Sequence, residues 1–298
     1  MLLPILHGTV NGPFLAAWDF SPPVMIGVLL AAFGYYLAWR QLKLVGRATP
    51  PGWQIVCYYA GLATVIIALL GPIDTFNDEL FFLHMAQHLA LMQVAAPLIL
   101  LGRPVQLGLK AISVKRSGPV LKKVLRLRAV RTSLALITAP LFATAAYNAN
   151  LIFWHVPGMY DAALKNTNVH DVEHLMFFGF ALLFWWPIID PVPRHHKMAK
   201  HWAIAAIFMT MVVGIGIGAI LTLSPSVVYP YYNGTVKPWG LSPLTDQQIG
   251  GLIMWVGGGF IYLFILIGLL VSALGGFEDE DVAVARPAEF SDAPAQGS

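Results

Sequence analysis

The chain has 298 residues, of which 57% are hydrophobic and only 11% are charged, and its formal net charge is +3. A soluble domain of this size carries about twice that charged fraction, so the composition excludes an ordinary soluble domain and indicates an integral membrane protein. The single cysteine, Cys57, excludes an internal disulfide and any zinc or iron–sulfur site built on several cysteines.

Apolar runs long enough to cross a membrane recur along the chain, because about 20 apolar residues span the hydrocarbon core. We predict seven spans, at 22–39, 53–71, 80–101, 133–153, 170–189, 200–223 and 249–275. We interpret residues 102–132 as a basic, partly helical loop and residues 278–298 as a disordered acidic tail. The expected fold is an all-α bundle of seven transmembrane helices in one domain, residues 1–277, followed by the tail.

Lysine and arginine are concentrated in alternate connections. The loops 40–52, 102–132 and 190–200 and the tail hold 16 of them, whereas the opposite side holds only Lys165 and Lys237. Basic loops favour the cytoplasmic side, so we expect the N-terminus outside and the C-terminus in the cytoplasm. The basic loops should contact anionic lipid headgroups of the bilayer. The long basic loop lacks interleaved aromatic residues, so we expect no nucleic-acid partner.

Two pairs of histidines begin the third and fifth spans: His84 with His88, and His170 with His174. Residues four apart share one face of a helix, so each pair can direct both rings at one point. The predicted topology places both pairs, and His155 at the end of the fourth span, at one depth near the outer face. Imidazole is costly in hydrocarbon without a function. We therefore predict that these residues bind a metal ion, with His155 as a candidate fifth ligand; a single interfacial histidine also commonly packs or bonds between helices.

Nitrogen ligands suit zinc, copper, iron and nickel, and the residues alone leave the choice among these metals open. Met92 continues the line of His84 and His88, and a thioether ligand would favour reduced copper, although methionines in membrane helices more often serve packing. Asp161 and Glu173 are outer-side carboxylates that could orient an imidazole, and the sequence leaves the roles of all three residues open.

Three other functions account for parts of this pattern. The spacing His170-x-x-Glu173-His174 is that of an inverted zincin, which predicts a membrane zinc metalloprotease with the glutamate as base. A haem-binding electron-transfer subunit would use one histidine from each of two helices, which one-turn pairs fit poorly. A membrane scaffold would use the histidines for packing alone.

Several stretches together resemble the multi-span CtaG family of cytochrome c oxidase assembly factors. They are His84–His88, Trp154–Asp161, His170–His174, Phe184–Pro187 and Leu244–Trp255. The resemblance covers most of the chain, from about residue 20 to residue 275. It implies a role in making active haem–copper oxidase in the bacterial plasma membrane, with oxidase subunits as partners, and a role in copper supply has been proposed for the family. We therefore expect a metal-binding assembly factor rather than an enzyme, with copper as the metal and zinc as the alternative. The sequence leaves open whether identical chains associate.

Overall fold

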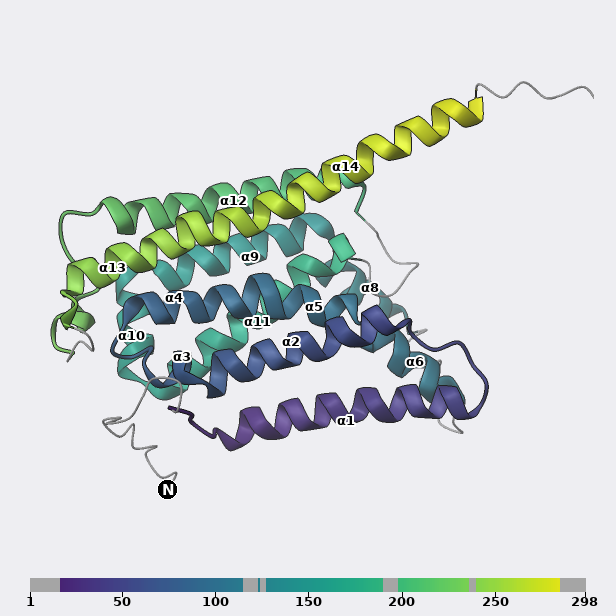
Figure 1. Ribbon diagram of the computed structural model, residues 1–298, viewed down its shortest axis with the longest axis horizontal. Helices are drawn as coiled ribbons and strands as arrows, with labels where there is room; N and C mark the ends of the chain where they lie inside the picture. Colours follow the sequence, from purple (N-terminus) through teal and green to yellow (C-terminus); the bar gives the residue numbers. More distant parts are fainter. Residues whose placement is uncertain (1–16, 115–122, 124–126, 190–197, 236–239, 285–298) are drawn as a thin grey trace, which may run out of the picture.

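The computed structural model describes residues 17–114, 123, 127–189, 198–235 and 240–284, and these residues form a helical bundle without β-strands (Figure 1). Among them, six helices are long and apolar enough to cross a membrane: Pro22–Leu44, Gly52–Thr75, Phe81–Ser113, Thr167–Ile189, Lys200–Leu223 and Pro243–Leu274. A bent pair, Arg128–Ile137 with Pro140–His155, makes a seventh span if it is counted as one. The predicted all-α, multi-span class is therefore confirmed.

The first two spans form an antiparallel pair. Helix α1 (Pro22–Leu44) packs against α2 (Gly52–Leu70), and the rings of Tyr35 and Tyr58 stack between them with centroids 4.0 Å apart. The short helix α3 (Pro72–Thr75) follows directly. Proline begins α1 and α3, where its fixed φ suits the first turn and its missing N–H has no intrahelical acceptor.

The third span is continuous but not uniformly α-helical. It consists of α4 (Phe81–Leu89), a π-helical turn η2 (Ala90–Ala95) and α5 (Ala96–Leu101), and α6 (Pro104–Val114) follows. Pro97 lacks the amide hydrogen that would bond one turn back, and a π-turn is a common way for a helix to absorb such a gap. The histidine pair His84 and His88 lies in α4, before this turn.

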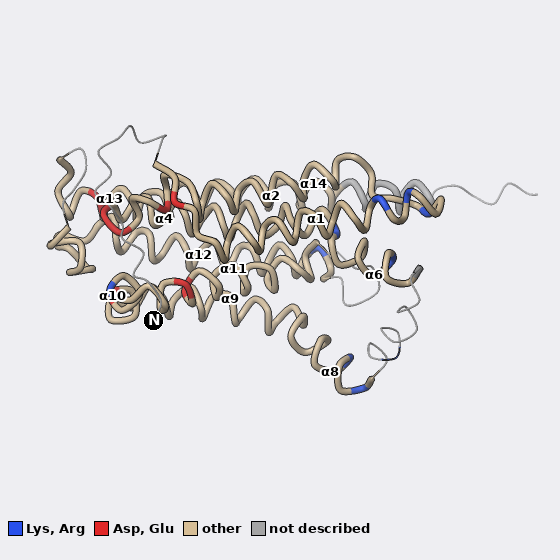
Figure 2. The backbone as a smooth tube through the Cα atoms, turned by 90° about the horizontal axis from the view of Figure 1, so that it is seen from below, with Lys and Arg blue, Asp and Glu red and all other residues tan. Residues whose placement is uncertain are grey.

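The fourth span differs from the prediction of one helix at 133–153. The structure has two helices here, α8 (Arg128–Ile137) and α9 (Pro140–His155), with a 55° bend between them. Proline disfavours the α conformation in the residue before it, and Ala139 is extended for this reason. The bend turns α8 away from the bundle, as Figure 2 shows.

Helix α11 (Thr167–Ile189) is central to the bundle, because it packs against α9, α5 and η2. Its residues Phe177, Phe184 and Trp185 are buried in the largest apolar cluster. The Trp185 indole donates a 2.9 Å hydrogen bond to the carbonyl oxygen of Met92 in η2. This contact fixes α11 beside the third span, so their two histidine pairs lie side by side. The short helix α10 (Pro157–Lys165) connects α9 to α11.

The last two spans cross closely. Helix α12 (Lys200–Leu223) packs against the final span, which consists of α13 (Pro243–Leu252), a second π-turn η5 (Ile253–Gly258) and α14 (Gly259–Val284). The loop between α12 and α13 includes the 3₁₀ turn η3 (Pro230–Asn233). Helix α14 extends to Val284, so residues 278–284 of the expected disordered tail continue this helix, whereas 285–298 lie outside the described residues.

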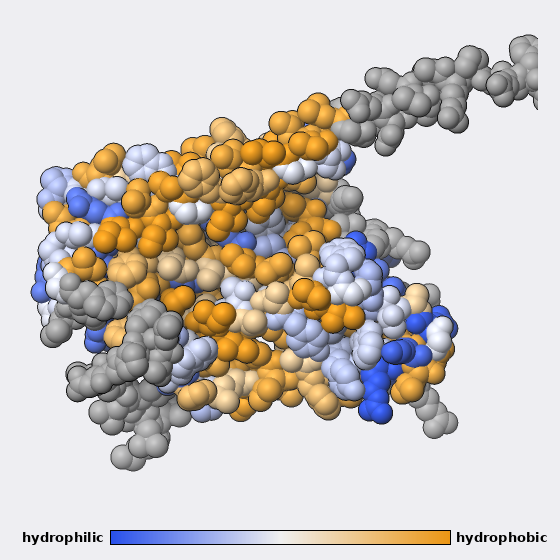
Figure 3. Space-filling model, in the orientation of Figure 1, coloured by the Kyte–Doolittle hydropathy of each residue, from blue (hydrophilic) through white to orange (hydrophobic). Residues whose placement is uncertain are grey.

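The surface agrees with a lipid environment. Large apolar side chains are exposed along α1, α12 and α14, and the middle of the face seen in Figure 3 is predominantly hydrophobic. Lysine and arginine gather at the end of the bundle that holds α6 and α8, and aspartate and glutamate gather at the other end, near α4 and α13 (Figure 2). The histidine-bearing start of α4 is at the acidic end.

Candidate metal centre

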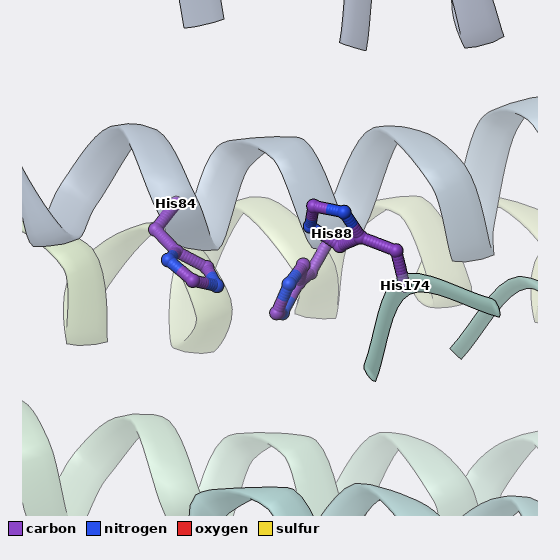
Figure 4. Close-up of side chains that lie close together, drawn as sticks. All are labelled: His84, His88 and His174. Carbon is purple, nitrogen blue, oxygen red and sulfur yellow. The ribbon is translucent and has the colours of Figure 1, made fainter. Parts of the chain in front are cut away.

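Four imidazole rings from two helices meet inside the bundle. The ring centroids of each one-turn pair are 4.4 Å apart for His84 and His88 and 4.3 Å apart for His170 and His174. Between the helices, the centroid distances are 5.0 Å from His84 to His170 and 5.3 Å from His88 to His174. Figure 4 shows the rings of His88 and His174 meeting between the two helices, beside His84. The predicted convergence of the two pairs is confirmed.

The cluster contains two overlapping sets of three ligands. One set is His84, His88 and His174, and the other is His84, His170 and Glu173; within each set, one donor atom per residue lies within 4.8 Å of the others. Donors bound at about 2.0–2.1 Å to a tetrahedral ion lie roughly 3.3 Å apart. Small side-chain rotations would therefore bring either set to coordination distance.

The burial of these groups supports a ligand function. His84 and Glu173 are 0% exposed and His88 is 2% exposed. Among the described residues, no hydrogen-bond partner serves either ring nitrogen of His84 or His88, or either carboxylate oxygen of Glu173. His84 Nε2 lies 3.8 Å from Glu173 Oε2, which is too long for a hydrogen bond. Each unsatisfied buried group costs about 1–3 kcal/mol, and metal coordination would satisfy several of them together.

His155 lies outside both sets. Its Nδ1 lies 2.7 Å from the carbonyl oxygen of Leu151, an arrangement in which Nδ1 donates and Nε2 keeps its lone pair. The ring of Phe177 contacts both His88 and His155, with centroid distances of 4.4 and 6.2 Å. The structure thus brings four of the five predicted ligands together and does not bring His155 into their group.

Two further candidates also lie apart from the cluster. The thioether of Met92, in η2, accepts a 3.6 Å hydrogen bond from the hydroxyl of Tyr147, which itself lies 2.9 Å from the hydroxyl of Tyr262. The carboxylate of Asp161 lies 3.6 Å from the ammonium group of Lys165 on the same helix. Neither Met92 nor Asp161 belongs to either ligand set.

Sequence reasoning assigned no role to Asp246, a residue of α13 whose carboxylate lies at the N-terminus of α4. Its carboxylate oxygens accept hydrogen bonds from the backbone N–H groups of Phe81 (2.9 Å) and Phe82 (3.0 Å), and the side chain is fully buried. The N-cap residue of α4, Leu80, has no side chain that can do this. Asp246 therefore caps the histidine-bearing helix from a span 164 residues further along the chain. The only signal in the sequence was its occurrence in the stretch Leu244–Trp255.

Aromatic side chains cover the end of the cluster near the connecting loops. The ring of Tyr160 on α10 lies 5.2 Å from that of His84 and 4.1 Å from that of Tyr229. The hydroxyls of Tyr160 and Tyr232 lie 3.1 Å apart, and the hydroxyl of Tyr229 donates to the carbonyl oxygen of His155. Burial raises the pKa of all three tyrosines, so their hydroxyls remain protonated at neutral pH. They form a neutral, hydrogen-bonded cover over the imidazoles.

Fold and site together define a multi-pass helical membrane protein with four imidazoles and a carboxylate gathered in its interior. The family model for the cytochrome c oxidase caa3 assembly factor (Caa3_CtaG) matches residues 33–275. The chain belongs to this family, as the resemblance of its motifs predicted.

Relatives occur in mycobacteria. An uncharacterized protein of Mycobacterium leprae is 23% identical over 275 residues, which is 91% of this chain and 41% of the relative. Uncharacterized proteins of Mycobacterium bovis and Mycobacterium tuberculosis are each 25% identical over 246 residues, 81% of this chain and 37% of theirs. The chain thus spans about two fifths of the length of these relatives. No solved structure matches it.

Proposed function

We propose that this protein binds copper at His84, His88, His170 and His174 and delivers it to a cytochrome c oxidase during assembly. The observation that carries the proposal is the meeting of four imidazoles from two helices, those of His84 and His88 buried and those of His170 and His174 half-buried. No described side chain or backbone group satisfies the ring nitrogens of His84 and His88. Imidazole is a good ligand for copper, and for zinc as the alternative metal. Family membership supplies the link to the oxidase.

We also propose an orientation in a bacterial plasma membrane. Basic residues gather at the α6 and α8 end of the bundle, so we assign this end to the cytoplasm (Figure 2). The histidine cluster then lies near the outer face. An ion held there would be accessible to an oxidase subunit whose metal site is on the same side.

Metal analysis of purified protein tests the binding step. The wild-type protein in detergent is loaded separately with copper and with zinc, desalted and analysed for bound metal. We expect about one copper ion per chain. We expect the quadruple His→Ala variant at positions 84, 88, 170 and 174 to hold none.

Two matched controls accompany this variant. His155→Ala removes a buried imidazole outside both ligand sets, and His201→Ala removes an exposed one on α12. Both should retain wild-type copper content. Retention of copper by the quadruple variant, or loss of copper in His201→Ala, would contradict the site. A preference for zinc over copper would replace the proposed metal.

The delivery step requires a cellular assay. A strain that lacks the gene is complemented with wild type or the quadruple variant, and the copper content and activity of its cytochrome c oxidase are measured. Immunoblots check that both proteins reach the membrane in equal amounts. We expect only the wild type to restore a copper-loaded oxidase. Full oxidase copper with the quadruple variant would exclude delivery through this site.

A further inference from the structure

Glu173 is a fully buried carboxylate in the middle of the histidine cluster. It lies on α11 between His170 and His174, and both of its oxygens lack a hydrogen-bond partner among the described residues. Its carboxylate approaches His84 Nε2 at 3.8 Å. Burial of a carboxylate without hydrogen bonds is unfavourable, and coordination of a cation would compensate for that cost.

The second ligand set gives Glu173 this coordinating function. His84 belongs to both sets; the all-imidazole set adds His88 and His174, and the mixed set adds His170 and Glu173. His84 and His170 each lie about one turn from the start of their helix, whereas His88 and His174 lie one turn deeper. The mixed set is therefore closer to the end of the bundle, and the all-imidazole set is deeper inside it.

Charge selects the ion that fits. Metal ligands bind as carboxylate and neutral imidazole, so the two sets together contribute one negative charge. A monovalent copper ion makes the buried site neutral, whereas a divalent ion leaves one uncompensated positive charge in an apolar interior, which is costly. Carboxylate is also a poorer donor than imidazole to a soft ion, so the mixed position should be the weaker of the two.

We propose that the cluster holds one Cu(I) ion at two adjoining positions that share His84, with Glu173 as counter-charge and as ligand of the outer position. This inference rests on the proposed function. The ion is held at the all-imidazole position. It leaves through the mixed position as its bonds to His88 and His174 break and bonds to His170 and Glu173 form, while the bond to His84 remains. Copper stays monovalent throughout, so this ligand exchange requires no oxidant or reductant.

Competition with a chromophoric Cu(I) chelator under reducing conditions tests the counter-charge. Glu173→Gln keeps the shape of the side chain and removes its charge. Because it leaves a buried cation unpaired, we expect Cu(I) affinity to fall about 30-fold or more. Asp171→Asn removes an exposed carboxylate two residues away on the same helix and should have no effect. Equal affinities for these two variants would overturn the proposal.

Combined variants test the two positions. His88→Ala should keep a weaker Cu(I) ion at the mixed position, and addition of Glu173→Gln to it should abolish binding. His84→Ala removes the shared ligand and should abolish binding alone. His84→Phe, which preserves the ring volume, should do the same and separates ligand loss from misfolding. Circular dichroism and gel filtration monitor the fold of every variant.

The outcomes separate this inference from the proposed function. Absence of copper in the wild type would refute both. Copper binding by the wild type, together with retained binding in both His84 variants or in the His88→Ala/Glu173→Gln variant, would refute only the two shared positions. In that case copper would be held by the remaining histidines of the cluster, without His84 as a shared ligand or without Glu173.

Discussion

Removal of the Asp246 carboxylate should loosen the start of helix α4 and thereby weaken the metal centre. This carboxylate accepts hydrogen bonds of 2.9 and 3.0 Å from the first two amides of the helix. A hydrogen bond to a charged group contributes about 1.5–3 kcal/mol, and a lost N-cap costs about 0.5–2 kcal/mol. Because the two bonds are not independent, we expect Asp246→Ala to lower the free energy of unfolding by about 2–4 kcal/mol.

Asp246→Asn should cost less, about 1–2 kcal/mol, because the amide keeps one acceptor oxygen but loses the charge that interacts with the helix N-terminus. Unfolding in mixed detergent and denaturant, followed by tryptophan fluorescence, measures both variants against Asp171→Asn. Hydrogen exchange at the amides of Phe81 and Phe82 reports the cap directly and should accelerate. The reasoning is refuted if Asp246→Ala is as stable as the exposed-site control and both amides exchange at wild-type rates.

Three further predictions follow from packing and polar contacts. A Cβ at Gly218 would lie 2.7 Å from backbone atoms of the final span, so Gly218→Ala should lower the free energy of unfolding by about 1–3 kcal/mol. A Cβ at Gly214 would have nothing within 4 Å, so Gly214→Ala should leave the free energy of unfolding unchanged. Denaturant titration compares the two variants. Tyr147→Phe leaves the buried Tyr262 hydroxyl without this contact and should cost about 1–2 kcal/mol in the same assay. His155→Ala should lower the melting temperature through loss of a buried ring while Cu(I) affinity stays within about twofold; a tenfold loss would make this residue a ligand.

Local properties of the sequence predicted the class of fold and most of the spans. An apolar run of about 20 residues crosses a bilayer whatever its neighbours are, so hydropathy alone located α1, α2 and α12 to within a few residues. The prediction of the fourth span as one helix was wrong, because Pro140 and the extended residue before it separate α8 from α9 inside a single apolar run. Residues 278–284 were assigned to the tail on composition, although the backbone continues as helix.

The candidate site was predictable to the extent that it depends on helix periodicity and on the alternating direction in which successive spans cross the membrane. Spacing of four placed each histidine pair on one face, and alternation placed both pairs at one depth. Neither argument specifies which helices are neighbours. The same limit applies to Gly214 and Gly218, which form one Gly-x-x-x-Gly pattern, yet only Gly218 lies at the crossing with the final span.

By itself, the sequence determined a multi-span helical membrane protein with two one-turn histidine pairs, because hydrophobicity and helical periodicity are properties of short segments. Only the tertiary structure decided that α4 and α11 lie side by side, that Glu173 enters the cluster while His155 stays outside it, and that Asp246 caps α4 from the last span. These facts depend on contacts between residues far apart in the chain. The packing of whole helices determines such contacts, so they cannot be predicted from the pattern of a short segment.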